Sequence, residues 1–263
     1  MFLFKTTISN YFWQVFFLLF LSQQCIASFH VINDHTYEND SALSAFVKAQ
    51  ISVTPNLDKG KATYQACILC HTKDGSRLDG FCYALPGTYP KLQIHNKEQL
   101  FTRFYKRVLS EDQYPSLIPR EMRLPVSDSN GAFNPQKLAN VVSYIASIDQ
   151  SKDIEYTNKG SGLDLVNGEY IYTQRCVFCH GIKGVSPQAS AIDTYSFPIP
   201  NIGSQHYRFL LRQLKWIKTG RRKLPKNLTQ MKLILQDLTY KDLEAVSDYV
   251  SRLDCLNCEK SSR

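Results

Sequence analysis

The feature that most constrains this chain is a five-residue motif, Cys-x-x-Cys-His, that occurs twice among its 263 residues. One copy spans Cys67–His71 and the other spans Cys176–His180. Two thiols three positions apart can reach both vinyl groups on one edge of a porphyrin, and the adjoining histidine then lies under the ring and ligates iron. A single copy also suits a zinc site or a thiol redox centre. Two copies predict two covalently attached haem c groups.

The sixth ligand of each iron is predicted from the methionines. Met122 and Met231 are the only methionines after Met1, and each lies 51 residues after a motif histidine. Methionine more often fills gaps in a core, but equivalent positions in the two copies favour axial ligation, which raises the potential relative to bis-histidine ligation. His95 and His206 are the competing ligands, and both are interpreted as exposed or packing residues. The predicted site residues are therefore Cys67, Cys70, Cys176 and Cys179 for covalent attachment and His71, Met122, His180 and Met231 for iron.

Other features repeat with the motif and indicate a duplicated helical domain. A proline follows each motif, at Pro90 and Pro200. Helices are expected before each motif (58–66 and 163–175), after each proline (98–109 and 205–219) and after each methionine. The last pair is marked by apolar residues at helical spacing, namely Leu138, Val141, Val142, Ile145 and Ile148, and then Leu243, Val246, Val250 and Leu253. With no strand-like alternation, the predicted fold class is all-α.

The termini and the connection are expected to lie outside the two helical domains. Lys5 and the apolar run Tyr11–Leu21 resemble a cleaved export signal, since the run is short for a membrane span. An uncleaved anchor and a lipidated Cys25 are the alternatives. The predicted divisions are a signal peptide (1–28), an N-terminal extension (29–57), domain 1 (58–149), a linker (150–162), domain 2 (163–254) and a C-terminal tail (255–263).

Three cysteines remain after the signal peptide and the two motifs are set aside, namely Cys82, Cys255 and Cys258. A zinc site would need four ligands. In an oxidising compartment the simpler expectation is one disulfide, either within the Cys255/Cys258 pair or from that pair to Cys82.

The formal net charge of +8 restricts the partners. The basic residues are spread out, with their densest cluster at residues 221–223, and there is no nucleic-acid motif. With an export signal, an acidic redox protein or an anionic membrane surface is the expected partner, met in a transient encounter. Nucleic acid is not expected.

The segment Ile199–Arg222 carries a resemblance to a known family. It is similar to the Pro-x-Leu-x-Gly-Gln-His stretch and following helix of the cytochrome c4 family, which are di-haem proteins with two class I cytochrome c domains in tandem. The likeness covers about 58–254. Thr72, where the family usually has glycine, and the region from Glu98 depart from its pattern.

The resemblance implies two tandem cytochrome c-type helical domains, each enclosing one covalent haem. It implies a periplasmic electron carrier that accepts electrons from a donor such as a quinol-oxidising complex and passes them toward a terminal oxidase. It also implies that the carbonyls of Pro90 and Pro200 orient the proximal imidazoles. The alternatives are a di-haem oxidoreductase of the peroxidase or thiosulfate-oxidising type, which needs an open iron position, and a tethered redox subunit of a larger complex.

Overall fold

The computed structural model describes residues 41–72, 85–113, 120–148, 157–187, 199–222 and 229–254. Several sequence predictions lie outside these residues: the signal peptide, Cys25, the start of the extension, Cys82, and the tail with Cys255 and Cys258. We call 41–148 the first half and 157–254 the second half.

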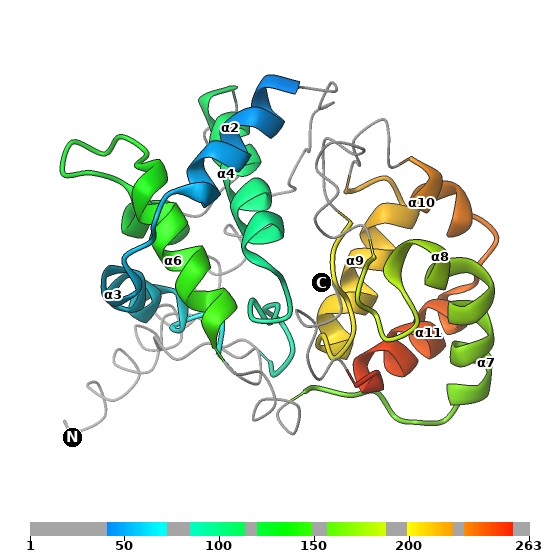
Figure 1. Cartoon of the computed structure of the whole chain (residues 1–263). Coiled ribbons are helices and arrows are strands. Elements are labelled where there is room, and N and C mark those ends of the chain that lie inside the picture. Colours follow the sequence, from blue (N-terminus) through cyan, green and yellow to red (C-terminus); the bar gives the residue numbers. More distant parts are fainter. Residues whose placement is uncertain are drawn as a thin grey trace, which may run out of the picture. The chain divides into compact units, whose positions relative to one another are not determined.

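Each half is built from helices around a hydrophobic core of its own (Figure 1). The first half contains α2 (Ser41–Ser52), α3 (Leu57–Cys67), α4 (Lys97–Gln113), α5 (Arg120–Arg123), η1 (Leu124–Val126) and α6 (Pro135–Ser147). The second contains α7 (Leu165–Ile171), η2 (Tyr172–Cys176), α8 (Val177–His180), α9 (Tyr207–Lys218), α10 (Gln230–Ile234) and α11 (Tyr240–Arg252). The helices expected from the sequence are present in both halves, with ends that differ by a few residues.

No strand occurs in the six described segments, where Ser127 and Phe133 form an isolated antiparallel bridge. Among the same residues, no helix has both the length and the apolar character needed to cross a bilayer.

The last helix of each half supplies the centre of its core. In α6 the apolar residues Leu138, Val141, Val142 and Ile145 are buried, and in α11 Leu243, Val246 and Val250 are buried. Both helices begin at a side-chain cap. Asn134 accepts a hydrogen bond from the Lys137 amide, and Thr239 and Asp242 form a capping box. The helical spacing of the apolar residues in the sequence thus correctly predicts which face of α6 and which face of α11 is buried.

A glycine allows the helix before each haem motif to cross the last helix at close range. A Cβ on Gly60 would lie 2.3 Å from the Asn140 carbonyl oxygen, and one on Gly168 would lie 2.3 Å from the Ala245 carbonyl oxygen. Only glycine permits such an approach between backbones. Figure 1 shows the resulting pairs, α3 beside α6 and α7 beside α11.

An aromatic pair completes each crossing four residues after the glycine. The rings of Tyr64 and Tyr144 have centroids 5.5 Å apart, and those of Tyr172 and Tyr249 are 5.7 Å apart. Both pairs are tilted, a geometry that aromatic quadrupoles favour. The two crossings therefore match in their glycine and in both tyrosines.

The two halves differ in the helix that leads from the crossing to the first cysteine. Cys67 is seven positions after Gly60, whereas Cys176 is eight positions after Gly168. The extra residue is accommodated in η2, which is a turn of π-helix, where each amide bonds five residues back. The wider turn takes up the extra residue, so that Cys176 ends its helix as Cys67 ends α3.

Helix α2 occupies part of the segment that the sequence left as an extension. It packs against α4 and α6, and its Val47 is fully buried in the first core. Phe46 stacks on Tyr105 with centroids 4.6 Å apart. Residues 41–52 therefore contribute to the core of the first half.

Candidate haem-attachment sites

The four motif cysteines lie where a helix ends or turns, and none of them is in a disulfide. Cys67 is the last residue of α3, and the Cys70 and His71 amides both bond back to its carbonyl oxygen. In the second half, Cys176 ends η2 and α8 carries Cys179 and His180. Each motif is thus a compact helical turn that presents both thiols and the imidazole together.

Burial suppresses ionisation of the first thiol in each motif. It raises the pKa of Cys67 to about 11, with a further contribution from the Cys70 charge, and the pKa of Cys176 to about 12. A thiol redox centre or a zinc ligand needs a thiolate, which a lowered pKa supplies. The raised pKa values therefore argue against a thiol redox centre.

Each motif histidine is held by the carbonyl of the proline that follows its motif. The Nδ1 atom of His71 lies 3.0 Å from the Pro90 carbonyl oxygen, and that of His180 lies 3.0 Å from the Pro200 carbonyl oxygen. Because a carbonyl only accepts, Nδ1 carries the proton and Nε2 is left as the lone-pair donor. The structure thus contains the hydrogen bond that the family resemblance implies, at the same length in both halves.

The His180 imidazole is kept neutral by its surroundings. Its side chain is buried, and burial lowers its pKa to about 4, opposed by the bond to Pro200 and reinforced by the Arg103 charge. A neutral imidazole is the form that binds a metal.

Each of the two methionines lies in a short helical turn near a cysteine-bearing helix. Met122 is in α5, which contacts α3, and Met231 is in α10. Both side chains are half-buried, and Met231 packs against the second core.

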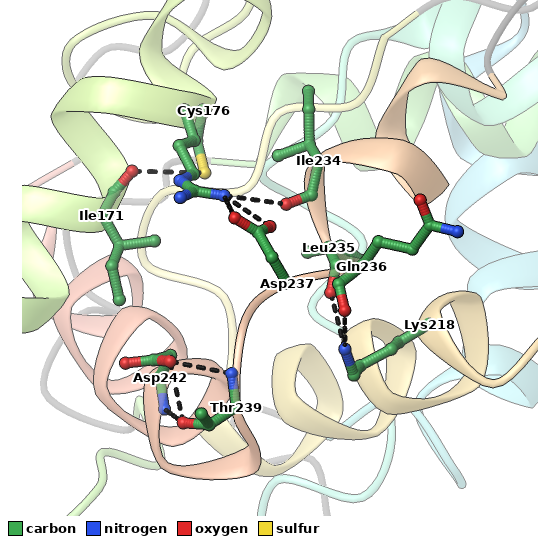
Figure 2. Close-up of polar contacts among 10 residues, drawn as sticks. Ile171, Cys176, Lys218, Ile234, Leu235, Gln236, Asp237, Thr239 and Asp242 are labelled. Atoms are coloured by element: carbon green, nitrogen blue, oxygen red, sulfur yellow. Dashed lines mark hydrogen bonds and ion pairs between the residues drawn. The ribbon is translucent and has the colours of Figure 1, made fainter.

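Polar contacts hold the segment 234–237, which follows Met231 in the chain, as Figure 2 shows. The Arg175 guanidinium bonds both carboxylate oxygens of Asp237 at 2.6 and 2.8 Å and reaches the Ile234 carbonyl at 3.5 Å. Lys218 Nζ donates to the carbonyls of Leu235 and Gln236 at 2.9 and 2.5 Å. The segment after Met231 is therefore tied both to the residue before Cys176 and to α9.

The two competing histidines have other partners. His206 is fully buried, and its Nδ1 accepts the Asn158 amide at 3.0 Å, so it is a packing residue rather than an exposed one. His95 is half-buried and shares a 3.3 Å hydrogen bond with Gln99. Burial, with the Arg103 charge, lowers the pKa of His95 to about 3.

Sequence reasoning missed the glycine–tyrosine crossings that place the motifs. The signal was available, because Gly60 and Tyr64 recur at the same four-residue spacing as Gly168 and Tyr172. It also missed the buried amide side chains of Gln99 and Gln205, which occupy different positions in the two copies. Within the described segments, no three His, Cys, Asp or Glu side chains cluster as a further metal site.

Comparisons with known proteins agree with this geometry. No family model matches the chain. Cytochrome c4 of Pseudomonas aeruginosa is 26% identical over 197 residues, which cover 74% of this chain and 87% of that protein. The chain is thus similar to a cytochrome c4 over most of its length.

Solved structures show the same fold. Reduced recombinant cytochrome c4 from Pseudomonas stutzeri superposes with a TM-score of 0.53 at 21% identity, over 76% of this chain and all of that one. The thiosulfate dehydrogenase TsdBA of Marichromatium purpuratum gives 0.54 at 20% identity, over 79% of this chain and 42% of that one. The fold is therefore that of tandem all-α cytochrome c domains.

The two motifs fit the cofactor of the cytochrome c4 family, which is two covalently bound haem c groups. Each half offers two thiols that form no disulfide on one helical turn, and an imidazole whose Nδ1 is already bonded; this imidazole is half-buried in the first half and buried in the second. The residues of each half thus fit one covalently attached haem c group.

Proposed function

We propose that this chain is an exported electron carrier in which His71 and Met122 ligate one haem iron and His180 and Met231 ligate the other. The observation that carries the proposal is the repeated pair of a motif histidine with a proline carbonyl at 3.0 Å. Two sites of the same construction, each followed by a methionine turn, suit two haems of the same kind.

In such a site the haem supplies reversible transfer of one electron between Fe(III) and Fe(II). The protein's residues determine how readily this happens. The cysteine thiols hold the ring covalently at one edge. The bond from Nδ1 to the proline carbonyl keeps the imidazole in one tautomer and makes it a stronger electron donor. The methionine thioether favours the reduced state.

An electron carrier is distinguished from an enzyme by its axial ligands, because in a carrier protein side chains occupy both axial positions of each iron. The alternative is a di-haem oxidoreductase of the peroxidase or thiosulfate-oxidising type, or a redox subunit tethered to a larger complex. Such an oxidoreductase needs one iron with an open or labile position. With a methionine turn in each half, we favour the carrier.

The location and partners follow from the same proposal. We propose that residues 1–28 direct export to the periplasm and are cleaved. The donor would be a redox protein such as a quinol-oxidising complex, and the acceptor one such as a terminal oxidase. A net charge of +8 favours an acidic docking face or a transient association with an anionic membrane, and either association weakens as salt rises.

Spectroscopy of the oxidised holoprotein tests this assignment. Methionine-to-iron ligation gives a weak charge-transfer band at the red end of the visible spectrum, and we expect it at full strength for two haems. Met122→Ala and Met231→Ala should each remove half of the band. The matched controls are Leu124→Ala and Leu233→Ala, which alter exposed residues beside each methionine and should leave the band intact.

A different spectrum would overturn the carrier assignment. If the wild-type protein contained one high-spin haem that bound cyanide tightly, the oxidoreductase alternative would replace it. A protein that is recovered only as part of a membrane complex would support the tethered subunit.

A further inference from the structure

Two buried glutamine side chains connect the halves of the chain. Gln99, in α4 of the first half, is 0% exposed, and Gln205, just before α9 of the second half, is 2% exposed. A buried amide group is costly unless its donor and acceptor are both satisfied. Both of these amides are satisfied, and each has partners in both halves.

Gln205 brackets the backbone of Lys91. Its Oε1 accepts the Lys91 amide at 2.8 Å, and its Nε2 donates to the Lys91 carbonyl at 3.1 Å. The same Oε1 also accepts the His206 amide in its own half at 2.9 Å. Lys91 directly follows Pro90, whose carbonyl holds His71. A second-half side chain thus fixes the loop behind the first-half histidine.

Gln99 makes the reciprocal connection. Its Nε2 donates to the Ile199 carbonyl at 2.6 Å, and its Oε1 accepts the Asn96 amide in its own half at 3.2 Å. Asn201 adds a second link by donating from Nδ2 to the Ile94 carbonyl at 2.8 Å. Ile199 and Asn201 flank the proline whose carbonyl holds His180. A first-half side chain therefore fixes the loop behind the second-half histidine.

We propose that Gln99 and Gln205 are positioning residues that hold the proline carbonyl of the opposite half against its histidine, so that each haem's potential depends on a residue of the other half. The proposal rests on the ligand assignment above. It concerns the histidine–proline hydrogen bond in each half. If the carbonyl is free to move, that bond weakens, the imidazole donates less to iron, and the oxidised state loses stabilisation.

The direction and size of the effect follow from this reasoning. Gln205→Leu removes both bonds to Lys91, so we expect the potential of the first haem to rise while that of the second is unchanged. Gln99→Leu should raise the potential of the second haem only. We expect about a threefold change in the ratio of reduced to oxidised haem, or about 28 mV at 59 mV per tenfold for one electron.

Potentiometric titration of the full-length holoprotein measures the effect. Each potential is assigned to its haem beforehand with Met122→His and Met231→His, because bis-histidine ligation lowers the potential of the altered site. The matched control is Gln213→Leu, whose side chain bonds Arg222 within the same half. This control should leave both potentials at their wild-type values.

A milder variant protects the test if a leucine variant does not fold. Gln205→Asn keeps a neutral amide but is one methylene shorter, so it cannot bond both the Lys91 amide and the Lys91 carbonyl, and the first haem should shift in the same direction. A shift in the variant's own half, or no shift in either half, overturns the proposal. Failure of the ligand assignment would look different, because the wild-type protein would then lack two haems with methionine bands.

Discussion

The two halves reach the same helix crossing with helices of different pitch. In the first half α3 runs as a regular α-helix from Gly60 to Cys67, while in the second η2 inserts a π-turn between Gly168 and Cys176. The glycine, the tyrosine pair and the histidine–proline bond are nevertheless alike. The difference teaches that the position of the first cysteine relative to the crossing matters more than the regularity of the helix that carries it.

Deletion of one residue from the helix before each motif should have the largest effect, and it tests whether these two helices are equivalent. Removing exposed Gln65 from α3 turns Cys67 by about 100° around the helix axis, so we expect loss of covalent haem from the first half. Removing exposed Gln174 from η2 converts the π-turn to the seven-residue spacing of the first half, and both haems should remain. Haem stoichiometry and mass measure the result. Equal loss from both deletions would contradict the equivalence.

Filling the crossing glycines should come next. Gly60→Ala and Gly168→Ala each place a Cβ 2.3 Å from a backbone oxygen that is held in a helix. We expect each to lower the free energy of unfolding by about 3 kcal/mol. Thermal unfolding of the holoprotein measures this, with Gln65→Ala and Gln174→Ala as exposed controls. A loss in only one half would show that the crossings are not equally tight.

The side chains that hold the segment before the crossing helix, Asn140 in the first half and Asp248 in the second, should differ in how much they stabilise the fold. The Asn140 side chain accepts one backbone amide, that of Asn56 at 2.9 Å, together with a bond from the Gln136 side chain at 2.9 Å. Asp248 accepts two backbone amides, those of Gly160 and Gly162 at 2.9 and 2.6 Å, and pairs with Arg252. We expect Asn140→Ala to cost about 1 kcal/mol and Asp248→Ala about 3 kcal/mol, because charged acceptors bond more strongly. Urea unfolding compares the two variants. Equal costs would remove the distinction.

The last expected effect is absent at neutral pH and develops only on acidification, as a pH dependence of stability in the first half. The pKa of His95 is lowered to about 3, from a usual value near 6.5, so the folded protein keeps this imidazole neutral. Between about pH 3 and 6.5 the unfolded chain binds the extra proton, and stability therefore falls as pH falls through this window. His95→Asn should flatten the decline between pH 7 and 4. The exposed control Lys61→Gln should not change the slope.

Much of the fold could be predicted from the sequence because it depends on local pattern. The apolar period of α6 and α11 and the residues of both motifs need no knowledge of the rest of the chain. The histidine–proline bonds came from a family resemblance and are present in the structure. The bonding of haem iron by Met122 and Met231 stays a prediction.

Other features could not be predicted from local sequence patterns. The π-turn has no residue signature and shows only as one extra residue between Gly168 and Cys176. Gln99 and Gln205 lie nine and five residues after their prolines, so alignment of the copies does not match them. Their role depends on contacts with the opposite half, as does the burial of His95 and His206 on tertiary packing. Helix α2 likewise contributes to the first core only after long-range packing.

The glycine crossings have a consequence for how such chains can grow. Because the helix before each motif lies against the last helix of its half, the stretch of chain that contains the motif begins and ends at one crossing. This stretch is topologically closed in both halves, and in the first half α2 packs onto it from outside. Another copy can therefore be joined end to end through a short connector without disrupting the packing of the existing one. This makes gene duplication an easy route from one redox centre to two.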